Sequence, residues 1–175
     1  MSLAISYIAN SLLILCLVTS IIQLRFLFKI QNYNFLSISQ ISAIQFLSIL
    51  ISFFILIFLF ITSDFNFDLV YFHSHSEKPL IYKLSGVWGN HEGSMLLWIL
   101  ILVLFNFLFS LSKSSSQKFK EITVAVQSLM IFGFVLFLLV LSNPFNINNE
   151  NFNDGLGLNP ILQDPLLAIH PPILY

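Results

Sequence analysis

Charged side chains are scarce in this sequence. Only 9% of its 175 residues are Asp, Glu, Lys or Arg, whereas a water-soluble domain carries roughly a quarter. The net charge of −1 excludes the basic surface that is typical of nucleic-acid binding. Hydrophobic residues make up 57% of the chain. This composition predicts an integral membrane protein whose environment is the lipid bilayer and which has no nucleic-acid partner.

Cysteine is almost absent, since Cys16 is the only one. A single cysteine cannot form an internal disulfide. Without a CxxC or CxxCH motif, the chain is neither a thiol oxidoreductase nor a covalent haem carrier. Cys16 lies inside an apolar run, which favours a packing role.

Basic residues are missing before Arg25, so the N-terminus lacks the features of a secretory signal or a transit peptide. Phe and Ile are frequent while Gly is sparse, which favours an AT-rich organelle gene. A hydrophobic chain without an import signal fits synthesis inside its own organelle. We therefore expect it in the mitochondrial inner membrane, with the bacterial inner membrane as the alternative.

Four apolar runs are long enough to cross a bilayer as helices, which takes about 20 residues. They cover residues 3–24, 38–61, 95–111 and 122–141. The predicted fold class is therefore all-α, a polytopic integral membrane protein with about four transmembrane helices. We expect residues 1–175 to form a single membrane domain.

A short helix is expected near the end of the sequence, on the outer side of the membrane. Asp164 has the side chain of an N-cap, and Pro165 suits the first helical position. Pro171 and Pro172 are expected to end this helix, because the residue before a proline disfavours the helical region. Residues 173–175 would then begin a fifth span. A helix that stops after one turn would make this chain a fragment of a larger, multi-chain protein.

Basic residues concentrate in two short loops, and this predicts the orientation in the membrane. Arg25 and Lys29 follow the first run, while three lysines lie in residues 113–120 between the third and fourth runs. The positive-inside rule places both loops on the cytoplasmic or matrix side. All of the histidines then fall on the outer side: His73, His75, His91 and His170.

The first polar motif, WGNHEGS, covers residues 88–94 and runs directly into the third apolar run. At helical spacing, Trp88, His91, Met95 and Trp98 would share one face. Such a face is a flat aromatic platform beside an imidazole, suited to a porphyrin or a quinone. It is equally typical of an aromatic anchor at the membrane interface, because interfacial Trp is common.

The second polar motif, DPLLAIHPP, covers residues 164–172. His170 directly precedes two prolines, which would fix its backbone in an extended conformation and project its ring from the head of the following helix. A metal ligand needs that kind of preorganisation. An ordinary histidine before a helix start remains the alternative.

The other polar segments carry weaker signals. His73 and His75 alternate along a segment that we expect to be a solvated loop. Residues 143–159 are rich in Asn and Gly and also predict a solvated loop with turns. Neither a phosphate-binding loop nor a GxSxG or HExxH motif is found in the sequence.

Taken together, WGNHEGS with Trp98 and QDPLLAIHPP with Tyr175 resemble the N-terminal part of CcmF. CcmF is the haem lyase subunit of the cytochrome c maturation (Ccm, System I) machinery, which attaches haem to the CxxCH motif of apocytochrome c. The resemblance implies that His170 is an axial ligand to haem b iron and that Pro171 and Pro172 orient it. It leaves WGNHEGS without a residue-level role.

Because the resemblance implies haem, we expect Trp88, His91 and Trp98 to shape the outer surface beside the cofactor. The sequence lacks the Trp-rich segment and the further histidines that complete the haem site in CcmF. The resemblance therefore implies a split-gene mitochondrial form that is not catalytic alone. Its expected partners are the remaining CcmF fragments that carry the Trp-rich segment, a CcmH-type subunit, the haem chaperone CcmE and apocytochrome c.

Two functions of other classes remain open. One is a structural membrane subunit of a respiratory or assembly complex without cofactor contact. The other is a quinone-handling electron-transfer subunit that uses the face of Trp88 and His91.

Overall fold

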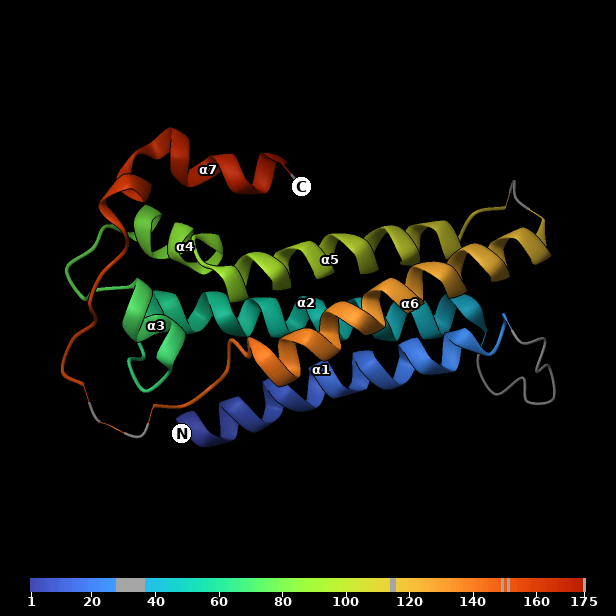
Figure 1. The fold of residues 1–175 in the computed structure, drawn as a ribbon, viewed down its shortest axis with the longest axis horizontal. Coiled ribbons are helices and arrows are strands. Elements are labelled where there is room, and N and C mark those ends of the chain that lie inside the picture. Colours follow the sequence, from blue (N-terminus) through green and yellow to red (C-terminus); the bar gives the residue numbers. More distant parts are fainter. Residues whose placement is uncertain (28–36, 114–115, 149, 151, 175) are drawn as a thin grey trace.

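The computed structural model describes residues 1–27, 37–113, 116–148, 150 and 152–174. Four of its helices are long and apolar enough to cross a membrane: α1 (Ser2–Leu24), α2 (Ile38–Thr62), α5 (His91–Ser110) and α6 (Gln117–Leu141). They form an antiparallel bundle in which α1 and α5 each pack against both α2 and α6 (Figure 1). The predicted all-α, polytopic fold class is confirmed.

Two of the spans begin earlier than predicted. Helix α5 begins at His91 rather than Met95, because the Asn90 side chain accepts a hydrogen bond from the amide of Gly93. Helix α6 begins at Gln117 rather than Ile122, because the Ser116 hydroxyl caps its first turn. The first N–H groups of a helix need an acceptor, so a polar cap can start a helix before its apolar run begins.

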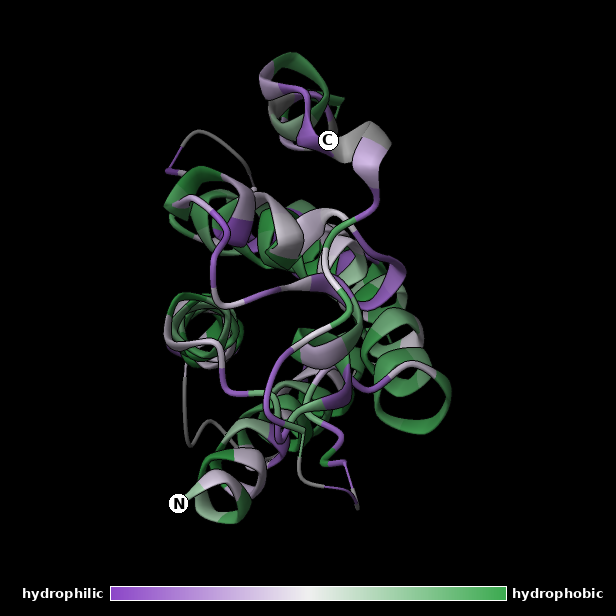
Figure 2. Cartoon of the chain, turned by 90° about the vertical axis from the view of Figure 1, so that its left-hand side faces the viewer, coloured by the Kyte–Doolittle hydropathy of each residue, from purple (hydrophilic) through white to green (hydrophobic). Residues whose placement is uncertain are grey.

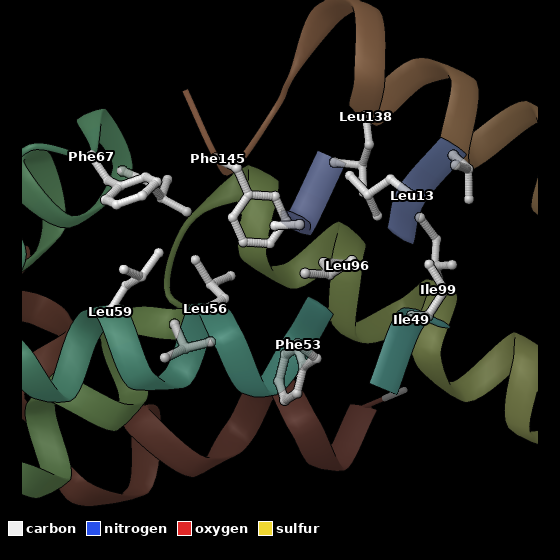
Figure 3. Packing of buried hydrophobic residues seen from close by; sticks show 14 of the residues in the cluster. Leu13, Ile49, Phe53, Leu56, Leu59, Phe67, Leu96, Ile99, Leu138 and Phe145 are labelled. Atoms are coloured by element: carbon white, nitrogen blue, oxygen red, sulfur yellow. The ribbon is translucent and has the colours of Figure 1, made fainter. Parts of the chain in front are cut away.

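The bundle core is a continuous cluster of aliphatic and aromatic side chains. Leu13, Ile49, Leu56, Ile99 and Leu138 come from all four spans and are fully buried. Figure 3 shows these side chains pointing toward one another between the helices. The outer faces of the spans are also apolar and lie exposed, as expected for helices that face lipid tails rather than water.

The short elements gather at one end of the bundle, where α2 ends and α5 begins (Figure 1). They are α3 (Asp68–His73), α4 (Leu80–Trp88), the 3₁₀ turn η1 (Pro160–Gln163) and α7 (Pro165–Leu174). Figure 2 looks onto this end and shows its hydrophilic connecting segments in front of the apolar helices. The histidines therefore belong to elements at one end, although the side of the membrane that they face stays a prediction.

Residues 143–159 were predicted to be a solvated loop, and this is only partly correct. The Phe145 side chain is fully buried, and its carbonyl accepts a hydrogen bond from the Ser6 hydroxyl at 2.8 Å. Further along, the amide of Leu156 donates to the carbonyl of Tyr71 at 2.8 Å, and the Phe152 ring stacks on the Tyr71 ring at 3.8 Å. The segment lies against the α2–α4 connection because its backbone and aromatic groups find partners there.

Candidate functional site

A sharp corner between α4 and α5 organises the WGNHEGS motif. The Asn90 side-chain amide donates to the carbonyl of Gly86 at 2.6 Å, while its oxygen accepts from the amide of Gly93 at 2.7 Å. One side chain thus satisfies the end of one helix and the start of the next. A Cβ atom on Gly93 would lie 1.6 Å from the carbonyl oxygen of Val87, so the corner has no room for any side chain there.

The corner removes Trp88 from the predicted common face, whereas His91, Met95 and Trp98 lie at the predicted spacing on α5. Trp88 is the last residue of α4, whereas His91 is the first residue of α5. Helical spacing does not continue across the Gly89-Asn90 junction, since Gly89 caps one helix and Asn90 the other. Trp88 therefore contacts α7, while His91 contacts α6.

His91 and Trp98 lie on the part of α5 that faces α6. The His91 ring meets the Phe137 ring edge-on at 5.7 Å, and its Nδ1 lies 3.4 Å from the Ser142 hydroxyl. The Trp98 ring packs against Phe134 with the centroids 4.5 Å apart. Both rings thus pack on α6 and do not form an open platform with Trp88. Trp88 and His91 therefore do not form the shared face that the expected quinone site requires.

Phe134 and Phe137 also line an apolar groove on the lipid-facing side of α5 and α6. Its other walls are Met95, Leu129, Met130 and Gly133. A Cβ atom on Gly133 would have no neighbour within 4 Å, which leaves this part of α6 open. The groove is a surface for apolar material and offers almost no polar atoms for specific recognition.

The DPLLAIHPP motif forms α7, and its start agrees with the prediction. The Asp164 carboxylate accepts hydrogen bonds from the amides of Leu166 at 2.8 Å and Leu167 at 3.2 Å. Pro165 is the first helical residue. This is the expected N-cap geometry, with a proline where no amide donor is needed.

The end of α7 contradicts the prediction, because the helix runs through Pro171 and Pro172 to Leu174. A fifth element starting at Ile173 is therefore wrong over the described residues, and Tyr175 lies outside them. Proline disfavours a helix interior, but its fixed φ of about −65° is itself helical. The cost comes from the missing backbone donors and from the clash of each proline ring with the carbonyl four residues earlier.

The extended backbone predicted for His170 is wrong, because the residue lies within α7, and its side chain is exposed. Among the described residues, its ring has no hydrogen bond or ion pair. An exposed neutral imidazole on a capped helix can serve as one ligand to a metal that has its other ligands elsewhere. No group of three His, Cys, Asp or Glu side chains that could hold an ion is found among the described residues.

Trp88 joins the two motifs directly. Its indole Nε1–H donates to the carbonyl oxygen of Ala168 at 2.7 Å, across 80 residues of sequence. Ala168 is buried at 3% exposure, although most of α7 around it is exposed. The contact between α4 and α7 is therefore specific and includes a polar anchor.

The other two histidines have structural partners. His73 is the last residue of α3, and its Nδ1 lies 3.0 Å from the carbonyl oxygen of Leu69. His75 lies 3.4 Å from the Asp154 carboxylate. Hydrogen bonds from the side chain and amide of Ser76 hold the pKa of Asp154 at about 2, with smaller help from Gly155 and His75. The predicted solvated loop is therefore wrong for His73, which lies in α3, and the part around His75 is a loop docked on Asp154.

One polar cluster escaped the sequence analysis. It lies inside the bundle, in the half away from α7, and its members are fully buried: Ser20, Gln23, Ser42, Gln45, Asn106 and Ser128. The Asn106 amide donates to the side-chain oxygens of Gln45 at 2.9 Å and Gln23 at 3.3 Å. The signal was available, because amide side chains inside predicted spans are rare and usually bond across helices.

The fold and the site define a polytopic membrane protein that holds a histidine-bearing helix against one end of a four-helix bundle. A model of the family described as "Cytochrome C assembly protein" matches residues 88–175, the part of the chain that contains both motifs. The chain belongs to the cytochrome c assembly protein family.

Relatives of known name share this similarity. The chain is 47% identical over 132 residues to the cytochrome c-type biogenesis protein ccl1 of Rhodobacter capsulatus. These residues are 75% of this chain and 20% of that protein. It is 37% identical over 135 residues to CcmF of Escherichia coli. These residues are 74% of this chain and 20% of that protein. The chain thus spans about a fifth of the length of these relatives.

The solved structure of a protein described as cytochrome c haem lyase CcmF has a similar fold. The TM-score is 0.66 at 22% identity, over 83% of this chain and 26% of that one. At this identity the likeness concerns the arrangement of the helices alone.

Proposed function

We propose that this chain forms the N-terminal part of a cytochrome c haem lyase and supplies His170 as an axial ligand to haem b. The observation that carries the proposal is the exposed His170 ring on α7, which has no partner among the described residues. Membership of the cytochrome c assembly family supports it, as do relatives named for cytochrome c biogenesis.

The residues present fit a haem iron better than a bare metal ion. A porphyrin supplies four of the ligands of its iron, so the protein needs to add only axial groups. A neutral imidazole is a suitable axial ligand, and one exposed histidine provides it. When bound, haem supplies the group that becomes joined to the apocytochrome, while the chain itself binds and orients this haem.

Each residue of the two motifs then has a task toward the cofactor. Asp164 caps α7, and the rigid backbone of Pro171 and Pro172 limits the freedom of the His170 ring. Trp88 anchors α7 to the bundle. His91 and Trp98, which pack on α6, would shape the neighbouring apolar surface rather than touch iron.

The proposed activity needs partners, because the chain offers one axial ligand and covers about a fifth of its relatives. We propose that the remaining CcmF segments, including the Trp-rich one, complete the haem surface. A CcmH-type subunit, the haem chaperone CcmE and apocytochrome c would be further partners. No catalytic residue is assigned to this chain.

We also propose that the protein is a mitochondrial inner-membrane form encoded in the organelle, as its Phe-rich and Gly-poor composition favours. The relatives described above are bacterial, and the bacterial inner membrane is the alternative. Fractionation with an antibody against the chain decides between the two membranes.

The experiment that tests the function is replacement of His170 in a cell that depends on this chain for cytochrome c maturation. His170→Ala should abolish or strongly reduce maturation while protein level and helicity stay unchanged, because the side chain is exposed. Added imidazole should restore part of the activity by filling the vacant axial position. Leu166→Ala is the matched control, since Leu166 is an exposed residue of the same helix.

Two outcomes bear against the proposal. Normal maturation with His170→Ala would contradict the ligand assignment and favour a purely structural membrane subunit. Loss of maturation with both His170→Ala and Leu166→Ala, without imidazole rescue, would assign the effect to the shape of α7 instead.

A further inference from the structure

The two prolines of α7 leave one carbonyl oxygen without an α-helical or a 3₁₀-helical donor. In an α-helix the carbonyl of Ala168 accepts from the amide of residue 172, and in a 3₁₀-helix from that of residue 171. Both positions are proline, which has no backbone N–H. Ala168 is also buried at 3% exposure, so water does not replace the missing donor easily.

The indole of Trp88 supplies that donor. Its Nε1–H lies 2.7 Å from the Ala168 oxygen, which is within the range of a good hydrogen bond. Indole nitrogen is a donor only, and the carbonyl is an acceptor only, so each group satisfies the other. Trp88 thus replaces the hydrogen bond that the proline pair removes from α7.

The indole is held firmly because it ends α4 at the corner with α5. The Asn90 side chain forms hydrogen bonds to both α4 and α5. Gly93 brings the start of α5 against the carbonyl of Val87. The donor therefore stands on the bundle itself, whereas the acceptor stands on α7. The hydrogen bond therefore attaches α7 to the bundle at the carbonyl that lacks its helical donor.

We propose that Trp88 is a positioning residue for His170. It satisfies the carbonyl that Pro171 and Pro172 leave open, and it thereby fixes α7 and the histidine two residues further on to the end of the bundle. The WGNHEGS and HPP motifs are then one structural unit. The role of this unit toward haem rests on the proposed function, whereas the docking of α7 does not.

An interfacial anchor is the competing explanation for Trp88. An indole that only marks the membrane interface needs its ring and not a particular partner for its N–H. Phenylalanine would then weaken the interfacial anchor but leave the docking of α7 unchanged. If Trp88 serves the Ala168 carbonyl, phenylalanine leaves a buried acceptor unsatisfied, which weakens docking by about tenfold or more.

A double-mutant cycle separates the two explanations, because Pro172→Ala restores the missing backbone donor to α7. Nitroxide labels at Ile81 on α4 and Leu166 on α7, which are both exposed, report the α4–α7 distance by pulsed electron paramagnetic resonance in the membrane-reconstituted chain. The labelled parent and Pro172→Ala should each give one narrow distance distribution. Trp88→Phe should raise the undocked population by about tenfold or more.

The double variant Trp88→Phe with Pro172→Ala should return to a narrow distribution, because residue 172 now donates to Ala168. Unchanged docking in Trp88→Phe would overturn the proposal. A double variant as broad as Trp88→Phe alone would refute the claim that the carbonyl left open by the prolines causes undocking, and it would leave Trp88 as a direct tether for α7.

The link to His170 has its own readout in the assembled lyase. The low-spin fraction of ferric haem should fall with Trp88→Phe in proportion to the undocked population. If α7 undocks and this fraction stays constant, positioning of His170 is refuted while the docking contact stands. If His170→Ala leaves the haem spectrum unchanged, the proposed function fails, and the docking result is unaffected.

Discussion

Two polar regions of this membrane protein are built in opposite ways. The cluster around Asn106 lies inside the bundle, is fully buried and bonds almost entirely to itself. The unit formed by Trp88 and α7 lies at the end of the bundle, and it presents His170 to the outside. The first region consists of neutral amides and hydroxyls and joins helices to one another. The second ends in an imidazole without a partner among the described residues.

The buried cluster therefore serves the packing of the helices, whereas the unit of Trp88 and α7 carries the candidate ligand. Polar groups inside spans cannot reach water, so each needs a partner within the protein. The Asn106 side-chain nitrogen meets this need with the side chains of three other spans, whereas its Oδ1 has no partner among the described residues. A ligand for an external cofactor has the opposite requirement, since its coordinating atom must stay free. The comparison predicts that changes in the two regions affect different properties.

The largest effect on stability is expected at the corner that carries the end unit. Gly93→Ala would place a Cβ atom 1.6 Å from the Val87 carbonyl oxygen, so α4 and α5 must separate. We expect a loss of about 3 kcal/mol or more in the free energy of unfolding, the upper end for overpacking. Denaturation in detergent, followed by circular dichroism, measures it.

Gly133→Ala is the matched control for that substitution. It also adds one methyl group to a helical glycine, but nothing lies within 4 Å of the new atom. The higher helix propensity of alanine should stabilise α6 by up to about 1 kcal/mol. Equal losses in both variants would contradict the proposed fit of Gly93 against Val87.

A smaller loss is expected from the buried cluster. Asn106→Ala removes hydrogen bonds to Gln23, Gln45 and Ser128. The amide nitrogen has two hydrogens to donate, so at about 0.6 kcal/mol for each interhelical bond in a membrane the expected loss is about 1 kcal/mol. The same unfolding assay measures it. Ser11→Ala, which removes one exposed bond within α1, should change stability by less than about 0.5 kcal/mol.

The smallest effect concerns the docked segment beside the end unit. The pKa of Asp154 is lowered from 3.8 to about 2, so its docking contribution is fully present above pH 3.8 and is lost as the pH falls toward 2. The amide of Ser76, which donates to Asp154 at 2.9 Å, should lose protection from hydrogen exchange in this window. Asp154→Asn should remove the pH dependence. A pH-independent protection factor in the parent chain would contradict this assignment.

The spans were predictable because long apolar runs carry the signal by composition alone. The site was harder, since it depends on where helices end. The helical spacing from Trp88 to Trp98 runs across Asn90, although Asn directly before a helical segment is an N-cap signal at which a new helix begins. The fit of Gly93 against Val87 depends on how the two helices fold back, and a residue pattern does not contain it.

The proline pair misled the prediction for a different reason. A proline pair usually ends a helix because donors are lost, and only a distant partner can replace them. Here Trp88 is that partner, 80 residues earlier in the chain. The docking of residues 143–159 is also a long-range effect. His170 could be named as a candidate from its motif alone, but its helical backbone could not be predicted, because the helix continues through both prolines.

The most direct test compares His170→Ala with Asn106→Ala in the assembled lyase, with haem absorbance and thermal stability measured on the same samples. His170→Ala should lose the low-spin haem spectrum and keep its unfolding temperature. Asn106→Ala should keep the spectrum and unfold at a lower temperature. Retention of the low-spin haem spectrum by His170→Ala would contradict the central claim that this exposed histidine is an axial ligand.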